Sequence, residues 1–330
     1  MKVLIVCSKN SGKIAPFIEE QVVSLKKCGL MLEYYTVQGK GVVGYMKNYK
    51  PLQSKIRDYK PDIIHAHYGL SGLLANLQRK VPVITTYHGS DINDSRVYRF
   101  SRISMMLSAH NIFVSEKNLD KAEKTPRPLS PFGYFLQKEK DNRNPNIVYL
   151  KNSLIPCGVE TDFFKPFDKV EARKILNLDN DKKYCLFAGA FDNKVKNAEL
   201  AIHAVALIPN LTLLELKGYS RQEVVYLMNA VDVVLMTSFT EGSPQFIKEA
   251  MACNRPIVSV LVGDVPEVID GVEGCYITSY EMEDVADKIK VALEFGKETN
   301  GRERIMELKL DSDTVVKRIL EVYNSVSSKQ

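Results

Sequence analysis

Two glutamates, Glu241 and Glu249, stand eight positions apart around the predicted start of a helix. The segment follows the β-branched run 231–236, and Pro244 favours the first turn of a helix, where proline is preorganised. The free N–H groups at the start of a helix form an anion site. Two carboxylates placed in this way can bind hydroxyls on two parts of one extended ligand whose phosphates lie between them.

Three histidines are further candidates for chemistry. His88 ends the predicted strand 81–87 and opens a polar loop, although it could also be a structural histidine bonded to nearby backbone. His65 and His67 alternate on another predicted strand, so both imidazoles share one face. No cluster of Cys, Asp or Glu stands nearby to complete a tetrahedral metal set. We therefore expect His65 and His67 to be polar residues at the carboxyl end of a strand, and we expect no metal site.

Two glycine-containing segments match phosphate loops only in part. The segment around Gly12 follows the first predicted strand, but Cys7 and Ile14 stand where a P-loop needs Gly and Ser or Thr. Residues 39–44 read Gly-Lys-Gly-Val-Val-Gly, but they follow the second predicted strand, and Pro51 restricts the helix that should come next. We interpret residues 39–44 as a flexible loop.

Short β-branched runs alternate with amphipathic segments along most of the chain. Strands are predicted at 3–7, 32–37, 62–67, 81–87, 112–115, 146–156, 184–187, 211–216, 231–236, 256–260 and 275–278. Helices are predicted at 14–28, 70–79, 197–208, 221–230, 243–253, 281–295 and 311–325. Residues 117–147 carry several prolines and predict a loop-rich insertion. The alternation predicts an α/β protein with two doubly wound parallel sheets, which bind ligands at the carboxyl ends of their strands.

Composition limits the class of protein. A length of 330 residues favours two domains, and ordinary hydrophobic and charged fractions of 45% and 26% exclude a disordered or fibrous chain. The formal net charge of +5 suits phosphate-bearing ligands or anionic lipid but is too small to indicate a nucleic-acid partner. Six scattered cysteines predict free thiols. No apolar run is long enough for a membrane span, so we expect a cytoplasmic protein, with peripheral association at the inner face of the cell membrane left open.

The block EGSPQFIKEAMACNRPIVS, which carries both glutamates, resembles the donor-binding signature of retaining glycosyltransferases of family GT4, which have the GT-B fold. Five other segments are similar to the same family in the same order: DIIHAHYG, TYHGSD, IPCGVETDFFKP, LFAGAFDNKVKN and GDVPEVI. The resemblance implies two doubly wound Rossmann-like domains facing a central cleft. We expect an N-terminal acceptor-side domain at 1–165, a nucleotide-sugar domain at 166–310, and a helix at 311–330 that packs back on the first domain.

The resemblance also implies roles for individual residues. Glu249 would bind the ribose hydroxyls of a nucleotide diphosphate sugar, Glu241 would bind hydroxyls of the transferred sugar, and His88 would lie near the reacting sugar or acceptor. Gly12 would allow its loop to approach the phosphates, and Tyr219 would lie near the base. The backbone around the helix start would bind the sugar and diphosphate; its residues are Gly242, Ser243, Pro244, Gln245 and Phe246.

One departure from the family pattern concerns the diphosphate. These enzymes usually carry Gly-Arg and then a lysine, whereas this chain has Gly189, Ala190 and then Lys196. Either Lys196, with help from Lys194, suffices to bind the diphosphate, or the donor differs, or the activity is weak. We expect Glu241, His88 and Lys196 to be the catalytic residues.

The resemblance implies a hexosyltransferase that moves a sugar, with retention, from a UDP-linked donor to a glycan or lipid-linked acceptor in bacterial cell-surface polysaccharide synthesis. No cofactor is expected, because fixed cations and a helix N-terminus can stabilise the leaving diphosphate without a metal. Two alternatives stay open. One is a nucleotide-sugar 2-epimerase of the same fold, and the other is a non-catalytic protein that binds nucleotide sugars, which Ala190 would favour.

Overall fold

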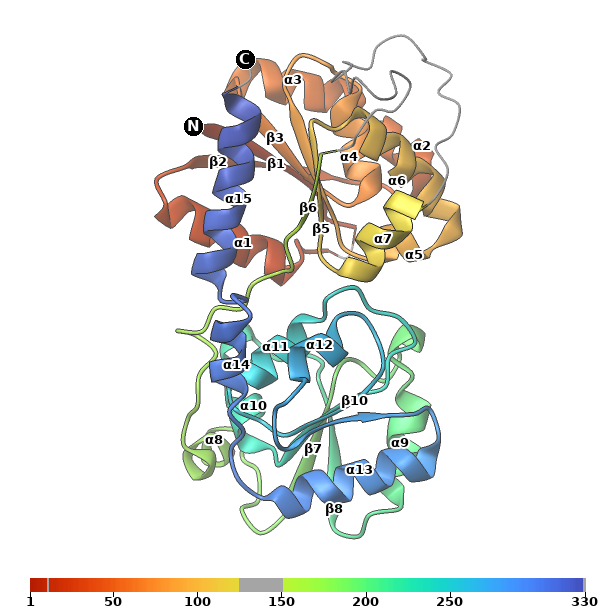
Figure 1. The fold of residues 1–330 in the computed structure, drawn as a ribbon, viewed down its shortest axis with the longest axis vertical. Coiled ribbons are helices and arrows are strands. Elements are labelled where there is room, and N and C mark those ends of the chain that lie inside the picture. Colours follow the sequence, from red (N-terminus) through yellow and green to blue (C-terminus); the bar gives the residue numbers. More distant parts are fainter. Residues whose placement is uncertain (11, 125–150, 329–330) are drawn as a thin grey trace, which may run out of the picture. The chain divides into compact units, whose positions relative to one another are not determined.

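A computed structural model describes residues 1–10, 12–124 and 151–328 and confirms the α/β class (Figure 1). The chain forms two compact units. Unit 1 comprises residues 1–156 and 316–330, and unit 2 comprises residues 157–315. The boundary therefore lies earlier than the expected position after residue 165, so the segment Cys157–Lys165 belongs to unit 2. The final helix, α15 (Ser312–Ser327), begins in unit 2 and continues into unit 1.

Unit 1 contains one parallel sheet with the strand order β2-β1-β3-β4-β5-β6. Its strands are β1 (Lys2–Ser8), β2 (Met31–Val37), β3 (Ile63–His67), β4 (Val83–Tyr87), β5 (His110–Phe113) and β6 (Asn152–Leu154). Besides α15, its helices are α1 (Pro16–Lys27), α2 (Gly41–Met46), α3 (Tyr49–Tyr59), α4 (Gly69–Asn76), α5 (Ser90–Asn93), α6 (Ser95–Leu107) and α7 (Glu116–Lys124).

Unit 2 contains a second parallel sheet with the strand order β11-β10-β9-β7-β8. Its strands are β7 (Lys183–Phe187), β8 (Leu211–Glu215), β9 (Val233–Met236), β10 (Ile257–Val260) and β11 (Cys275–Thr278). Its helices are α8 (Lys169–Ile175), the 3-10 helix η1 (Lys194–Lys196), α9 (Ala198–Ala206), α10 (Arg221–Ala230), α11 (Gln245–Ala252), α12 (Val265–Ile269), α13 (Met282–Phe295) and α14 (Gly301–Glu307).

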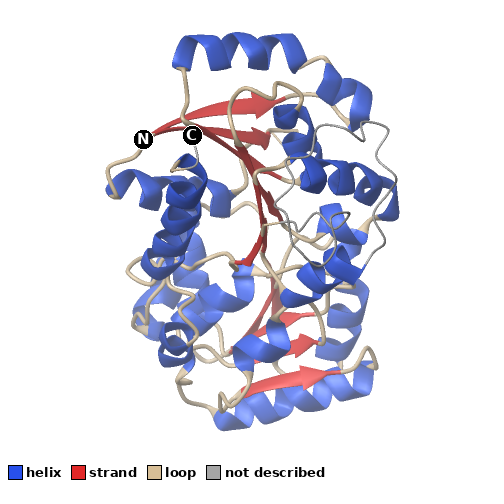
Figure 2. Ribbon diagram, turned by 45° about the horizontal axis from the view of Figure 1, so that its top comes forward, coloured by secondary structure: helices blue, strands red, loops and turns tan. Residues whose placement is uncertain are grey.

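Helices cover both faces of each sheet (Figure 2). Alternation along β7 explains how the sheet of unit 2 is held between them. Tyr184 and Leu186 pack into one buried cluster, whereas Cys185 and Phe187 pack into the cluster on the other face. Burial of each large side chain of this kind contributes about 1.5–3 kcal/mol, and β-branched residues fit the pleated surface.

The order of the strands reverses once in each sheet, and these points define where ligands can bind. In unit 1 the reversal lies between β1 and β3, and in unit 2 it lies between β7 and β9. Ligands of open α/β sheets bind outside the carboxyl ends of the strands at such a point. The loop with Gly12 follows β1, and the loops with Lys196 and Glu241 follow β7 and β9. The topology therefore gathers the predicted site residues at these two edges.

Several local expectations differ from the structure. Residues 41–46 form α2 rather than a flexible loop, and α7 occupies the start of the expected insertion at 117–147. The rest of that insertion, from residue 125, lies outside the described residues. The strand expected at 146–156 is reduced to β6 among the residues that are described. All six cysteines are free thiols, as expected.

Candidate functional site

The helix that carries Glu249 begins at the reversal point of unit 2. Pro244 lies directly before α11 in an extended conformation and serves as its N-cap residue, without a side-chain cap. The first N–H groups of an α-helix have no partner within the helix, so Gln245 and Phe246 begin a segment suited to an anion. Gln245 is itself fixed by a 2.7 Å hydrogen bond from its Nε2 to the Gly158 carbonyl. The expected placement of residues 242–246 around a helix start is therefore what unit 2 contains.

Lys196 and Glu241 form an ion pair beside this helix start. Lys196 Nζ lies 2.7 Å from Glu241 Oε1, and the two side chains are only 23% and 18% exposed. The stem of Lys196 lies against Gly189, where a Cβ would come within 2.9 Å of the lysine Cγ. The backbone of η1 is also held, because Thr237 Oγ1 donates to the Lys196 carbonyl at 3.0 Å. A cation and a carboxylate are thus fixed at the same edge of the sheet.

Glu249 is nearly buried in α11 and has a partner that the sequence analysis missed. Its side chain is 5% exposed, and its Oε1 lies 2.8 Å from Nη2 of Arg221, the first residue of α10. The Arg221 guanidinium also lies over the Phe164 ring, 4.3 Å from the ring centroid. The arginine that the family pattern leads one to expect at position 190 is absent, but Arg221 supplies a guanidinium to the other glutamate.

A buried lysine supports the same helix start. Lys248 is fully buried, and its Nζ contacts Ser243 Oγ, donates to the Cys157 carbonyl at 2.8 Å and lies 3.4 Å from Asp264. Ser243 Oγ donates to Asp264 Oδ2 at 2.6 Å. A buried ammonium group is costly unless it is paired, and Lys248 is paired by these contacts. The same contacts hold the Ser243 side chain in place at the start of α11. Neither Lys248 nor Asp264 was predicted, although both lie in segments that carry the resemblance.

Lys194 and Tyr219 take no part in these contacts. Lys194 is the exposed first residue of η1. Tyr219 is partly exposed and directly precedes Ser220, whose side chain caps α10 together with Glu223. Both residues lie in loops that follow the carboxyl ends of strands of unit 2. Among the described residues, neither side chain forms a hydrogen bond or an ion pair with Lys196 or Glu249.

The histidines form a buried chain in unit 1. His65 and His67 stack with ring centroids 4.5 Å apart, which confirms that the two imidazoles share one face of β3. His67 Nδ1 lies 3.0 Å from His88 Nε2, and His65 hydrogen-bonds the hydroxyl of Tyr323 on α15 at 2.6 Å. His88 lies at the carboxyl end of β4, between the rings of Phe17 and Tyr68. The contacts with His67, Phe17 and Tyr68 therefore fix the orientation of His88.

Burial keeps these histidines neutral. Desolvation lowers the pKa of His65 and of His88 to about 3, and that of His67 falls well below its ordinary value for the same reason and because of the two neighbouring histidines. Burial also raises the pKa of Asp91 to about 6, although backbone N–H groups of Gly69, His88 and Gly89 donate to its carboxylate. Gly12, in the neighbouring loop of unit 1, has a φ of 90°, which glycine adopts without strain.

The stability of the protein should fall on acidification because of the three buried histidines, His65, His67 and His88. Between pH 6.5 and about 3 the unfolded chain protonates its histidines and the fold does not, so each lowered pKa removes up to about 1.4 kcal/mol per pH unit. Asp91 acts in the opposite direction between about pH 4 and 6, because the fold binds a proton that the unfolded chain has lost. The destabilisation from the three histidines exceeds the stabilisation from Asp91, so the free energy of unfolding should fall. Urea unfolding at pH 7.5, 6 and 5 measures the effect.

The variant His65→Asn should flatten this dependence by about one proton, whereas His203→Gln should not, because His203 is exposed on α9. A difference in unfolding free energy between wild type and His65→Asn that stays constant from pH 7.5 to 5 would contradict the assignment.

Within 1–10, 12–124 and 151–328, no group of three or more His, Cys, Asp or Glu side chains could hold a metal ion. In the same ranges, none of the helices combines the length and the apolar character needed to cross a bilayer.

Two parallel, doubly wound sheets, with a paired cation and carboxylate beside a helix start at the reversal point of unit 2, define a two-domain α/β fold. Two family models match the chain, one in each unit. "Glycosyltransferase Family 4" matches residues 19–128, and "Glycosyl transferases group 1" matches residues 209–294. The chain belongs to the group 1 and family 4 glycosyltransferases.

Curated relatives are similar over most of this chain. The D-inositol 3-phosphate glycosyltransferase of Mycolicibacterium smegmatis is 25% identical over 275 residues, which cover 71% of this chain and 60% of the relative. The enzyme of the same name from Mycobacterium tuberculosis strain F11 is 23% identical over 283 residues, covering 73% of this chain and 56% of the relative. The chain thus spans about three fifths of the length of the curated relatives it matches.

Solved structures confirm the GT-B fold. Sucrose-phosphate synthase from Thermosynechococcus elongatus has a TM-score of 0.80 at 16% identity, with all of both chains covered. HepE from Anabaena in complex with UDP has a TM-score of 0.72 at 16% identity, covering 98% of this chain and 100% of HepE. UDP-GlcNAc 2-epimerase from Methanocaldococcus jannaschii is less similar, with a TM-score of 0.59 at 11% identity, covering 98% of this chain and 100% of that one.

Proposed function

We propose that this protein transfers a hexose, with retention, from a nucleotide diphosphate sugar to a glycan or lipid-linked acceptor in the synthesis of cell-surface polysaccharide. The observation that carries the proposal is the 2.7 Å contact between Lys196 and Glu241 beside the start of α11. A sugar nucleotide needs a cation at its diphosphate and hydroxyl acceptors at its sugar, and this contact holds the two within one donor's reach. HepE has been solved with UDP and with UDP-glucose, which supports UDP as the nucleotide.

The proposed roles follow from charge and position. Lys196 and the N–H groups at the start of α11 stabilise negative charge that grows on the departing diphosphate as its bond to the anomeric carbon breaks. Glu241 accepts hydrogen bonds from hydroxyls of the sugar, and Glu249 accepts them from the ribose. The acceptor hydroxyl bonds to the anomeric carbon on the face that the diphosphate leaves, and its proton passes to the leaving group. His88 acts near the reacting sugar or acceptor, and Gly12 lets its loop approach the phosphates.

A panel of nucleotide sugars tests the proposal. Each is scored by the shift in thermal unfolding and by nucleotide release, with and without acceptors that include oligosaccharides, lipid-linked sugars and inositol phosphate, which the names of the curated relatives indicate. A bound donor should stabilise the protein by about 2.7 kcal/mol at one hundred times its dissociation constant. Transfer to any acceptor supports the proposal. Conversion of the donor to its 2-epimer, or binding without nucleotide release, would favour the two alternatives.

Activity should survive chelation of metals. The charge of the leaving diphosphate is stabilised by Lys196 and a helix start, so no divalent cation is required. Nucleotide release in excess EDTA should stay within about twofold of the untreated rate. A complete loss that magnesium or manganese restores would show that a metal holds the diphosphate instead.

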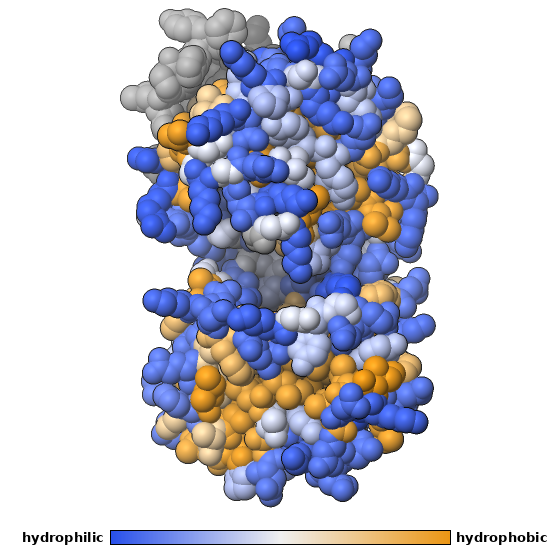
Figure 3. All heavy atoms as spheres, turned by 180° about the vertical axis from the view of Figure 1, so that it is seen from behind, coloured by the Kyte–Doolittle hydropathy of each residue, from blue (hydrophilic) through white to orange (hydrophobic). Residues whose placement is uncertain are grey.

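A lipid-linked acceptor implies contact with an anionic membrane, and unit 1 offers a basic surface for it. The basic residues on and beside α2 and α3 that are exposed are Lys40, Lys47, Lys50, Arg57 and Lys60. Arg96 and Arg99 on α6 are also exposed, whereas Arg102 is half-buried. Val43 and Met46 of α2 are exposed beside these cations, although hydrophilic side chains predominate on the visible face of unit 1 in Figure 3. Each cation contributes about 1 kcal/mol near anionic lipid.

Vesicle flotation tests this contact. The protein should float with vesicles rich in anionic lipid and should remain at the bottom with neutral vesicles. The variant Lys47→Glu/Lys50→Glu should float at least about tenfold less, whereas Lys174→Glu/Lys182→Glu, which makes the same charge change at exposed positions of unit 2, should float normally. Flotation that is indifferent to the charge of the lipid would end this part of the proposal.

A further inference from the structure

A cavity of about 540 Å³ lies at the amino-terminal edge of the sheet in unit 2. Its residues come from the segment that leads into α8, from positions directly before or at the first residues of β7, β9 and β10, and from the end of α13 and the residues that follow it. The donor site proposed above lies at the opposite, carboxyl edge of the same sheet. The strands between the two edges have four or five residues, so the two sites are separated by about 13–17 Å.

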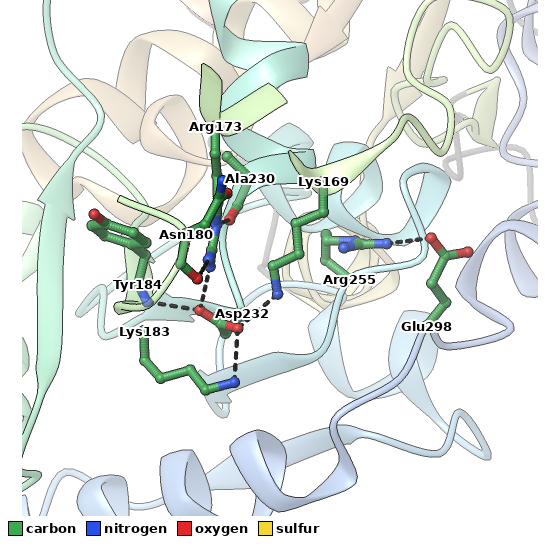
Figure 4. A network of polar contacts seen from close by, with 9 residues as sticks. All are labelled: Lys169, Arg173, Asn180, Lys183, Tyr184, Ala230, Asp232, Arg255 and Glu298. Atoms are coloured by element: carbon green, nitrogen blue, oxygen red, sulfur yellow. Dashed lines mark hydrogen bonds and ion pairs between the residues drawn. The ribbon is translucent and has the colours of Figure 1, made fainter. Parts of the chain in front are cut away.

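One buried carboxylate in this cavity is shared by three cations (Figure 4). Asp232, which is 6% exposed, places Oδ1 2.6 Å from Lys169 Nζ and 3.5 Å from Lys183 Nζ. Its Oδ2 lies 3.0 Å from Arg173 Nη2 and accepts the Tyr184 N–H at 2.8 Å. Both oxygens are therefore fully used, and one negative charge faces three positive ones.

The guanidinium groups of Arg173 and Arg255 make other contacts, which leaves the lysine ammonium groups in excess over the carboxylates at this cavity. Arg173 donates from Nε to the Ala230 carbonyl at the end of α10, and Arg255 donates from Nε to the Cys253 carbonyl at the end of α11. Each guanidinium thus offsets the partial negative charge of a helix C-terminus as well as one carboxylate, Asp232 or Glu298. The remaining cations on the cavity are the ammonium groups of Lys169, Lys183 and the exposed Lys297.

Asp168, the remaining acidic residue that lines the cavity, does not balance the charge of these ammonium groups. Asp168 is exposed, and its side chain accepts the Glu171 N–H as the N-cap of α8. Lys297 pairs with Glu273 at 3.7 Å, but both side chains are largely exposed, and such surface pairs contribute little. Burial lowers the pKa of Lys169, against the effect of Asp232, and the nearby charges of Arg173 and Lys183 lower it further.

Apolar side chains also line the cavity. Pro166, Phe167, Val231, Pro256 and Leu293 line the cavity beside the lysines. Cavities of 300–1,000 Å³ with apolar walls and a few convergent polar groups are typical of small-molecule sites. A free inorganic ion would use the lysines but would leave these side chains without a contact.

We propose that this cavity binds a phosphate monoester with an aromatic or other apolar body. Its phosphate group contacts the ammonium groups of Lys169 and Lys183, and its body packs against Phe167, Pro256 and Leu293. Because the site lies at the other edge of the sheet, the ligand binds without displacing a sugar nucleotide. The proposal is independent of the donor site and of the reaction.

Calorimetric titration of the full chain with phenyl phosphate tests the proposal, in the presence of saturating UDP so that the donor site is occupied. Phenyl phosphate should bind at one site, at least about tenfold more tightly than inorganic phosphate or phenol, since each of these lacks half of the contacts. Lys169→Gln/Lys183→Gln should weaken binding at least about tenfold. Lys174→Gln/Lys182→Gln, which removes two exposed lysines outside the cavity, should leave it unchanged.

A second variant guards against loss of folding. Lys183 is 59% exposed, so Lys183→Gln should keep the fold, which thermal unfolding confirms, and should still weaken phenyl phosphate binding about threefold or more. Three results would overturn the proposal: no saturable binding, equal binding by Lys183→Gln and wild type, or binding that is lost when UDP is present.

Discussion

Replacement of Lys196 by alanine is expected to lower donor turnover by at least about 100- to 1000-fold, the usual cost of removing one preorganised group that stabilises charge in a transition state. Position 190, where the family pattern has an arginine, holds an alanine, so fewer fixed cations meet the leaving diphosphate. The start of α11 supplies only about half a charge. Lys196 is held in place by its contact with Glu241 and by the close approach of Gly189.

Lys194 is the matched control, because it carries the same charge two residues earlier but is exposed. Lys194→Ala should lose about tenfold or less. Steady-state nucleotide release with both variants, at saturating donor, measures the difference. A Lys196→Ala enzyme within about threefold of the parent would contradict the role assigned to this lysine.

The two glutamates should fail in different ways. Glu249→Ala removes hydrogen bonds to the ribose that exist before and during the reaction, so KM for the donor should rise about tenfold or more while kcat changes little. Glu241→Ala acts beside the reacting carbon and should lower kcat about 100-fold, with a smaller effect on KM. Initial rates over a range of donor concentrations separate the two constants.

Each glutamate also has an ion-pair partner, so the conservative variants are needed as controls. Glu249→Gln keeps a hydrogen-bond acceptor next to Arg221 and should restore part of the donor affinity, and Glu241→Gln does the same next to Lys196. The reverse pattern, with kcat falling in Glu249→Ala and KM rising in Glu241→Ala, would mean that the donor binds in the opposite orientation.

The periodic parts of the fold could be predicted from the sequence. The buried strands β7 and β9 read as continuous apolar runs, and α10 occupies the range expected for it, because Ser220 and Glu223 form a capping box at its start. The start of α11 was located through Pro244, which stands directly before it. These signals are local, so a single sequence contains them.

Long-range pairing could not be predicted in the same way. Arg221 and Glu249 lie in different helices, and nothing in the spacing of either residue points to the other. Nothing in the sequence around Lys248 indicates that it is buried, where its ammonium group contacts Ser243, Asp264 and the Cys157 carbonyl. Tyr323 hydrogen-bonds His65 although the two residues are 258 positions apart in the sequence. The helix α3 was missed because Pro51 lies in its first turn, where proline is tolerated.

The stereochemistry of turnover tests the central claim most directly. Proton NMR would follow the anomeric proton of the sugar while the full chain consumes the donor that scores highest in the panel, in EDTA. We predict that UDP and the transferred or hydrolysed sugar appear in equal amounts and that the first-formed sugar keeps the anomeric configuration of the donor. A product of inverted configuration would contradict the retaining mechanism, and an epimerised sugar that stays linked to UDP would contradict transfer itself.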